Sequence, residues 1–209
     1  MSTQKPEKGH RWFAALWDRI SASQERTTGT KIRPRIMGEA HGDVLEIGAG
    51  TGASFSYFPE DAQVIAIEPD PHMIERAHKR LAKLGAVNIQ LRQAAAESLP
   101  FDDDSFDHVV ASLVFCSVVD QAKAFAEVRS VLRPEGTFRF WEHIRNDDSR
   151  FWGTLQDAIT PIWRWCGAGC HPNRRTQQAI EEAGFTVEWI EKFRAAPGTP
   201  EIYGVARPG

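Results

Sequence analysis

The stretch Asp43-Val-Leu-Glu-Ile-Gly-Ala-Gly-Thr-Gly52 joins an apolar run to a turn with three glycines. The run over residues 43–47 predicts a buried strand, because nearly continuous aliphatic residues are typical of parallel sheets. The glycines that follow let the backbone approach a ligand without a clash from a Cβ atom. The helix expected over residues 51–58 directs its N-terminus to the same place, which favours a negatively charged group. The stretch therefore predicts a ligand-binding turn at the end of a parallel strand.

Strand and helix patterns alternate along the rest of the core. One helix is predicted from Asp70-Pro71 to Gly85, because Asp is a good N-cap, proline fits the first helical position and glycine ends helices. A second helix begins at Asp120, and a third is predicted over residues 177–183. The Pro134-Glu135-Gly136 segment is predicted as the turn into the fifth strand. Six further strands are predicted, over residues 63–67, 88–92, 105–113, 137–143, 185–193 and 201–206.

The connections decide how these strands pair. Strands joined through helices are expected to be parallel, whereas the loop over residues 195–198 is too short for a parallel crossover. The last strand is therefore expected to be antiparallel. We predict an α/β fold with a Rossmann-like, doubly wound sheet of seven strands, mostly parallel with the last strand antiparallel, plus a helical cap.

Length and pattern together predict one domain with two added segments. A chain of 209 residues can bury a large core, so it needs no disulfide or metal to hold it together. We predict a single domain over residues 1–209. Residues 1–40 would form an N-terminal helical cap, 41–145 the ligand-binding core, 146–172 a helical insert, and 173–209 the final helix and strands. Both added segments are expected to cover the bound ligand, with candidate wall residues Trp17, Phe151, Trp152, Trp163 and Trp165.

Charge and cysteine content exclude several classes of protein. The net charge is −3, from 25 Lys and Arg against 28 Asp and Glu, so there is no basic field to hold a nucleic acid. Three cysteines fit a reducing compartment better than a disulfide framework. The spacing of Cys166, Cys170 and His171 matches no common zinc motif, so no metal site is expected.

The N-terminal segment is polar and lacks the apolar core of a signal peptide. The longest apolar run, residues 109–119, is too short and too interrupted to span a bilayer. We therefore expect a cytoplasmic protein without integral membrane insertion. Weak contact with a membrane surface would involve Trp12, Phe13, Leu16 and Trp17.

Two acidic residues narrow the kind of ligand. Gly48, Gly50 and Ala53 also fit the dinucleotide-binding fingerprint, so a nicotinamide-dependent oxidoreductase is one alternative. Glu46 counts against it, because a carboxylate would repel a pyrophosphate, whereas it suits a ligand with an ammonium group. Glu68 follows the second strand, where its carboxylate could hold both hydroxyls of an adenosine ribose.

Four segments, in this order and spacing, resemble the motifs of class I S-adenosylmethionine-dependent methyltransferases: residues 44–55, 65–77, 94–115 and 132–138. This resemblance covers residues 43–143 and implies S-adenosylmethionine as the cofactor. A closer likeness over residues 43–206 is to the methyltransferase-like thiol S-methyltransferases of animals. It implies an alkyl thiol or hydrogen sulfide as methyl acceptor. The segments that carry it are Ser112–Val118, Phe140–His143, the tryptophan-rich insert with Gly169-Cys170, and Ile202–Gly204.

The resemblance also implies a set of cofactor-binding residues: Glu46, Gly48, Ala49, Gly50, Gly52, Glu68, Pro69, Met73, Ala96, Glu97 and Leu113. The residues up to Gly52 would line the methionine part, and Glu68 would hold the ribose. The adenine would pack between Pro69 and Met73, with Ala96 and Glu97 at its edge, and Leu113 would approach the sulfonium. Many relatives place an Asp where this chain has Ala95, which predicts weaker discrimination of the base. The membrane anchor of the animal enzymes is not expected to carry over.

Methyl transfer from a sulfonium is an in-line displacement, so the enzyme mainly supplies orientation. A thiol with a pKa near 8.5 yields its thiolate near neutral pH without a strong base. We name His143 and Cys116 as candidate catalytic residues, and His143 would accept the thiol proton. A structural histidine and a buried inert thiol are the alternative roles. A small-molecule acceptor is expected in each case, with a phospholipid amine or a quinone carbon as alternatives to a thiol.

Overall fold

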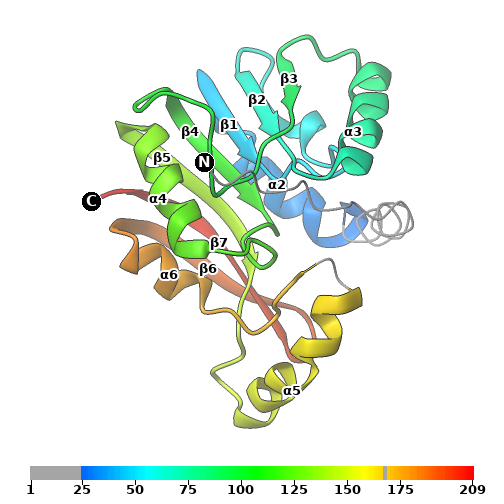
Figure 1. Ribbon diagram of the computed structural model, residues 1–209, viewed down its shortest axis with the longest axis vertical. Helices are drawn as coiled ribbons and strands as arrows, with labels where there is room; N and C mark the ends of the chain where they lie inside the picture. Colours follow the sequence, from blue (N-terminus) through cyan, green and yellow to red (C-terminus); the bar gives the residue numbers. More distant parts are fainter. Residues whose placement is uncertain (1–24, 167–168) are drawn as a thin grey trace, which may run out of the picture.

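The computed structural model describes residues 25–166 and 169–209, and its centre is one seven-stranded sheet (Figure 1). The strand order is β3-β2-β1-β4-β5-β7-β6. The strands from β1 to β5 pair in parallel, and β7 runs antiparallel to both of its neighbours. The predicted fold class is confirmed, including the antiparallel last strand. The strands are β1 Asp43–Ile47, β2 Gln63–Ile67, β3 Ile89–Arg92, β4 Phe106–Ser112, β5 Leu132–His143, β6 Phe185–Ala196 and β7 Thr199–Pro208.

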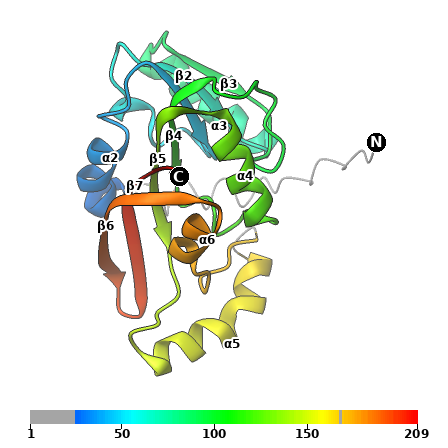
Figure 2. The ribbon, with the colours of Figure 1, turned by 90° about the vertical axis from the view of Figure 1, so that its left-hand side faces the viewer.

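Helices cover both faces of the sheet, as Figure 2 shows for α2 on one side and α4 with α6 on the other. Successive side chains of β4 point to opposite faces of the sheet. Val109 packs with α4 and α6, and Val110 packs in the cluster that contains α2. The helical segments are η1 Glu25–Gly29, α2 Thr30–Ile36, η2 Phe55–Tyr57, α3 Pro71–Leu84, α4 Gln121–Val131, α5 Arg150–Cys166 and α6 Thr176–Glu182.

The predicted helix ends follow from local hydrogen bonds. The Asp70 carboxylate accepts from the backbone N–H of His72 at 2.7 Å and so caps α3. Gly85 ends that helix in the left-handed conformation with φ of 66°. The carboxylate of Asp120 accepts from the N–H of Lys123 at 3.0 Å and caps α4.

Three predicted local structures are wrong. The Pro134–Gly136 turn lies inside β5 as an irregularity, because Phe106 pairs with Leu132 and then His108 pairs with Thr137. The last two strands extend to a tight turn at Pro197-Gly198 rather than a four-residue loop. The helix expected over 51–58 is reduced to η2, because Gly52 adopts φ of 82°, which no right-handed helix contains.

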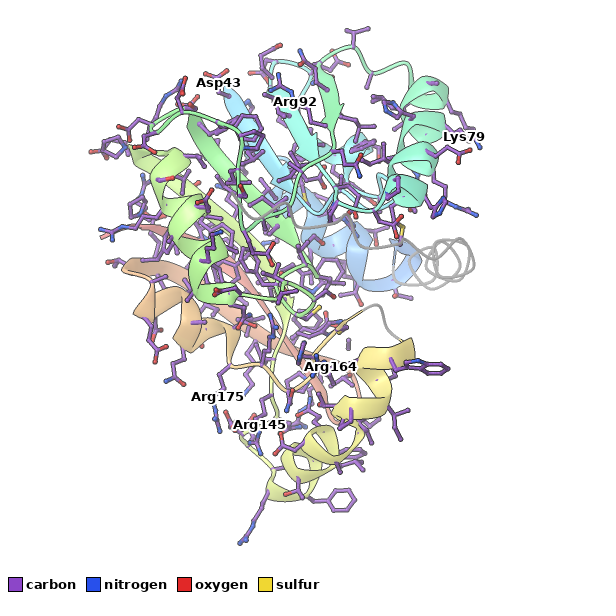
Figure 3. All side chains as sticks on the ribbon, viewed as in Figure 1. Asp43, Lys79, Arg92, Arg145, Arg164 and Arg175 are labelled. Atoms are coloured by element: carbon purple, nitrogen blue, oxygen red, sulfur yellow. The ribbon has the colours of Figure 1, made fainter. Side chains whose placement is uncertain are left out.

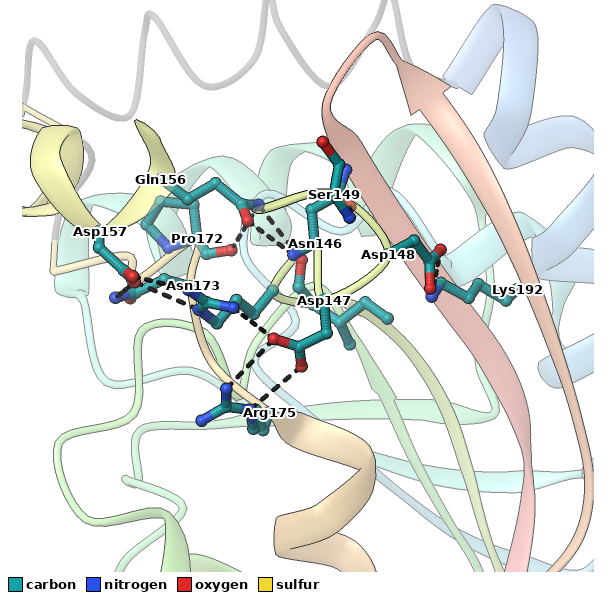
Figure 4. A network of polar contacts seen from close by, with 12 residues as sticks. Asn146, Asp147, Asp148, Ser149, Gln156, Asp157, Pro172, Asn173, Arg175 and Lys192 are labelled. Carbon is teal, nitrogen blue, oxygen red and sulfur yellow. Dashed lines mark hydrogen bonds and ion pairs between the residues drawn. The ribbon is translucent and has the colours of Figure 1, made fainter. Parts of the chain in front are cut away.

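Figure 1 shows that α5 extends from the sheet below the C-terminal end of β5. Its base is held by Gln156, whose side chain accepts from the Asn146 N–H and donates to the carbonyls of Ile144 and Pro172. Figure 4 shows this network together with the adjoining ion pairs. Trp152 packs under the β6–β7 turn, where a Cβ added at Gly198 would lie 2.2 Å from its ring.

The aromatic side chains expected to line the ligand pocket differ in their exposure to solvent. Those of Phe151 and Trp165 are exposed, at 69% and 86%, whereas Trp163 is half-exposed and contacts the Cys170 thiol. Trp17, like the amphipathic stretch around it, lies outside the described residues. Of the described helices, none is both long and apolar enough to cross a membrane.

Candidate active site

The predicted site residues lie at or shortly after the C-terminal ends of β1 to β5, which is where ligands bind in open α/β sheets. In Figure 3, Asp43 marks the opposite end of β1, and Arg164 of α5 lies beyond the C-terminal ends. The turn after β1 requires backbone conformations that glycine adopts readily, because Gly48, Gly50 and Gly52 all have positive φ. A Cβ at Gly48 would lie 2.5 Å from the Val114 side chain, so the turn packs directly on the segment after β4.

Glu46 is a buried acid with spare hydrogen-bonding capacity. Its Oε2 atom has no hydrogen-bond partner among residues 25–166 and 169–209, and the hydroxyl of Thr51 in the turn shares this property. Burial raises the pKa of Glu46 to about 7, although Ser54 and the Arg33 guanidinium act in the other direction. An ammonium donor from a ligand would satisfy this carboxylate.

Glu68 links the glycine turn to the next helix. One carboxylate oxygen accepts from the Gly50 N–H at 3.0 Å, and the other accepts from the Asp70 N–H at 2.9 Å. Burial raises the pKa of Glu68 to about 7, although those two hydrogen bonds act to lower it. Each oxygen keeps a second lone pair, so the group can still accept from the two hydroxyls of a ribose.

The other predicted cofactor positions follow β2 and β3, which are neighbours in the sheet. Pro69 is exposed, whereas Met73 and Ala96 are buried, and the Ala49 N–H donates to the Ile67 carbonyl at 2.9 Å. The Glu97 carboxylate accepts from the N–H groups of Val119 and Asp120. Its side chain therefore holds the start of α4, a role that its motif position did not indicate.

The segment after β4 is stabilised by a residue that the sequence analysis missed. Leu113 has φ of 60°, and Glu142 of β5 accepts from the N–H groups of Val114 and Phe115, both at 2.9 Å. Glu142 is fully buried, and burial raises its pKa to about 8 despite these bonds. Its signal in the sequence is an acid directly after the aromatic pair Phe140-Trp141.

The pKa of Glu142 predicts a pH-dependent stability. A carboxyl whose pKa rises from 4.5 to about 8 on folding stabilises the fold while protonated, and this contribution is lost as the pH rises through 8. We expect Glu142→Gln to remove that dependence. Between pH 5 and 8 the free energy of unfolding of the wild type should fall relative to the variant by on the order of 1 kcal/mol per pH unit.

Urea unfolding across this pH range measures the difference. The matched control is Glu60→Gln at an exposed position, which should follow the wild type. Parallel pH curves for the wild type and Glu142→Gln would contradict the assignment.

His143 lies beside a second buried acid. It pairs in register with Glu201 of β7, and His143 Nδ1 lies 3.3 Å from Glu201 Oε1. Glu201 is fully buried, and its other oxygen accepts from the Trp141 indole N–H at 2.6 Å. Within residues 25–166 and 169–209, Oε1 has no hydrogen-bond partner, so a small rotation of the imidazole would form a hydrogen bond to it.

The charge states of this pair follow from burial. Burial lowers the pKa of His143 to about 4, so its imidazole is neutral at pH 7. Burial raises the pKa of Glu201 to about 7, although the hydrogen bond from Trp141 acts to lower it. The His143 side chain retains 26% exposure, which leaves part of the ring accessible. The Arg33 guanidinium lies 5.4 Å from the Trp141 ring and connects this pair to the Glu46 region.

Cys116 differs from His143 in its surroundings. Its thiol is buried, lies 3.7 Å from the Leu113 carbonyl and contacts Cys170. The hydrogen bond with Cys170 and burial raise the pKa of Cys116 well above its ordinary value. It therefore remains a protonated thiol at neutral pH, which does not suit the proton acceptor of a methyl transfer.

A family model described as a methyltransferase domain matches residues 45–140. The chain is 36% identical over 173 residues to thiol S-methyltransferase TMT1B of Rattus norvegicus, covering 78% of this chain and 69% of that protein. It is 32% identical over 204 residues to thiol S-methyltransferase TMT1A of Homo sapiens, covering 93% and 82%.

The fold is similar to the crystal structure of the YcgJ protein from Bacillus subtilis, with a TM-score of 0.67 and 19% identity over 95% of this chain and 99% of that one. These findings decide against the nicotinamide-dependent oxidoreductase that the glycine turn left open. With its glycine turn, its two buried acids and these relatives, the chain belongs to the class I S-adenosylmethionine-dependent methyltransferases.

Proposed function

We propose that this methyltransferase transfers its methyl group to the sulfur of a small uncharged thiol, with His143 as the proton acceptor. The observation that carries the proposal is the neutral, partly exposed imidazole of His143 beside the buried carboxylate of Glu201. The similarity to thiol S-methyltransferases supports the choice of acceptor.

The described residues fit the cofactor. S-adenosylmethionine supplies, when bound, a methyl group on a sulfonium whose leaving group is a neutral thioether. Glu46 would bind the amino group of the methionine part, because its Oε2 atom has no hydrogen-bond partner among the described residues. Glu68 would hold the ribose hydroxyls, and the backbone of the glycine turn would follow the methionine part.

The proton step is assigned to one atom. With Glu201 ionised, His143 Nδ1–H donates to it, and the lone pair on Nε2 is free to accept the proton of the thiol. An alkyl thiol would thus become a methyl thioether, with the methyl group supplied by the bound cofactor and the thiol proton held at His143. The exposed part of the imidazole then returns the proton to water. Glu201 acts through His143 and is a positioning residue.

The charges of the insert support an uncharged acceptor. A cationic amine would need a carboxylate without another partner near the methyl group. Asp147 pairs with Arg175, Asp148 pairs with Lys192, and Asp157 accepts from Asn173, as Figure 4 shows. These three insert carboxylates are thus held by donors from outside the insert, so they are poorly suited to bind an ammonium group.

The cap belongs to the same proposal. Residues 1–40 and 146–172 would cover the acceptor and exclude water from the displacement. Within the described part, α2 buries Ile32 and Ile36 against the sheet, and Trp152 fixes α5 to the β6–β7 turn.

The test is a turnover screen with methyl-labelled S-adenosylmethionine. The acceptors are an alkyl thiol, hydrogen sulfide, a vesicle of phosphatidylethanolamine and a demethylated quinol. We expect methylated product from the two sulfur acceptors. Turnover of the lipid amine or the quinol in the absence of sulfur turnover would replace the proposed acceptor by that one.

A further inference from the structure

Cys116 and Cys170 lie side by side although they are far apart in the chain. The backbone N–H of His171 donates to the Cys116 carbonyl at 2.7 Å, and the His171 ring nitrogen Nδ1 lies 3.2 Å from the same oxygen. Gly169 directly precedes Cys170, and a Cβ added at Gly169 would lie 3.6 Å from the Ser117 carbonyl. The segment 169–171 therefore runs directly along residues 116–117, and the two thiols hydrogen-bond to each other.

The two thiols differ in accessibility and charge. Cys116 is 3% exposed, and its pKa is raised by the contact with Cys170 and by burial. Cys170 is partly exposed, and its pKa is lowered by the hydrogen bond with Cys116, by Trp163 and by the charge of Arg174. The Arg174 guanidinium is fixed in place because it donates to the Phe115 carbonyl. Cys170 is therefore the nucleophilic thiol of the pair, and Cys116 is shielded behind it.

We propose that Cys170 and Cys116 form a thiol–disulfide exchange site for small disulfides, with Cys170 as the attacking thiol and Cys116 as the resolving thiol. The two thiols are in contact, and their side chains differ in exposure as those of an attacking and a resolving thiol do. The proposed exchange does not depend on which acceptor the enzyme methylates.

The exchange balances in two steps. The Cys170 thiolate attacks one sulfur of a disulfide R–S–S–R, so that a Cys170–S–S–R bond forms and RS⁻ leaves. Cys116 then attacks the Cys170 sulfur, loses its proton to solvent, and expels the second RS⁻. The two cysteines are oxidised to one disulfide, and the small disulfide is reduced to two thiols. An excess of small thiol reverses both steps.

The bridge would connect two parts of the molecule that are now held by hydrogen bonds. One is the segment after β4, which contains Val114 against the glycine turn. The other is the connection from α5 to α6. The ratio of small thiol to disulfide would thus set the covalent state of the β4–α4 segment.

The experiment treats the full chain with oxidised glutathione, blocks remaining thiols with iodoacetamide and maps peptides by mass spectrometry. In the wild type we expect a Cys116–Cys170 disulfide and its full reversal by reduced glutathione. The Cys116→Ser variant should stop at a glutathione adduct on Cys170. The Cys170→Ser variant should form no adduct on Cys116, and Cys166→Ser should form the bridge as the wild type does.

The role of Arg174 provides a second measurement. In the Cys116→Ser background, Arg174→Gln should slow adduct formation several-fold, because the thiolate loses its neighbouring charge. The matched control is Arg175→Gln, whose guanidinium pairs with Asp147 instead and which should leave the rate unchanged. Circular dichroism verifies that each variant is folded.

Two outcomes would overturn the proposal. One is a wild type that keeps Cys116 and Cys170 alkylated together with a Cys116→Ser variant that gains no glutathione. The other is a bridge or adduct that forms at Cys166 in preference to Cys170. Neither readout involves methyl transfer, so the acceptor proposal and this one can fail separately.

Discussion

Replacing His143 with alanine is expected to lower kcat/KM for a thiol of pKa 8.5 by about 30-fold at pH 7, because only about 3% of such a thiol is ionised there. In the wild type the thiol proton would pass to His143 Nε2 as the sulfur–carbon bond forms, whereas the variant must select the thiolate from solution. This loss is smaller than the usual effect of removing a general base, about 10²–10⁴-fold, because thiols ionise readily by themselves.

The dependence of this loss on pH distinguishes a proton acceptor from a structural histidine. As the pH rises past 8.5 the thiol ionises in solution, so the ratio of wild-type to variant kcat/KM should approach one. A defect of the same size at pH 9.5 would assign His143 a structural role. The matched control is His78→Ala on the exposed side of α3, which should show the wild-type profile.

The pH dependence of kcat also tests the role of Glu201. Its pKa of about 7 means that the ionised form, which orients Nδ1–H toward itself, gains population as the pH rises through 7. At saturating cofactor and acceptor, kcat of the wild type should rise across this range. The Glu201→Gln variant should lack that rise, because an amide does not titrate. Identical pH profiles for both enzymes would remove Glu201 from the mechanism.

Replacing Glu68 with alanine is expected to weaken S-adenosylhomocysteine binding by about 2–4 kcal/mol, the cost of losing a buried charged hydrogen-bond partner. Titration calorimetry at pH 8 measures this loss, because Glu68 with a pKa of about 7 is mostly ionised there. The affinity of the wild type should fall as the pH drops below 7, and part of this fall should be absent from the variant.

A control is needed because Glu68 also accepts from Gly50 and Asp70 and so holds the turn itself. Thermal unfolding of the variant reports that structural share. Glu60→Ala, an exposed acid before β2, should bind as the wild type does. An unchanged affinity in Glu68→Ala would show that the ribose is held elsewhere.

The sequence predicted best those features that depend on neighbouring residues. The caps at Asp70 and Asp120, the glycine turn and the apolar strands all arise from local conformational preference and burial, so their patterns are visible in short windows. The bulge at 134–136 was missed because a Pro-Glu-Gly segment is compatible with a turn, and the pairing of β5 with β4 decides between the two.

The acids that shape the site were missed for a related reason. Glu142 binds the segment after β4, and Glu201 meets His143 through the pairing of β5 with β7. Both contacts join residues distant in the chain, and no local pattern shows which group a buried carboxylate will meet. Their signal is an acid next to a large apolar residue within a strand, as Glu142 follows Trp141 and Glu201 precedes Ile202. Such a residue has to find donors when it is buried.

The position of β7 between β5 and β6 has a consequence for the order in which the enzyme is assembled. A ribosome delivers β1 to β4, with the glycine turn and Glu68, well before residues 199–208, and until these arrive β5 has an open edge. His143 gains Glu201 only when β7 inserts into that edge. With His143 as the proposed proton acceptor, a nascent chain would acquire its glycine turn and Glu68 before it acquires the His143–Glu201 pair, and docking of the last hairpin would complete the site.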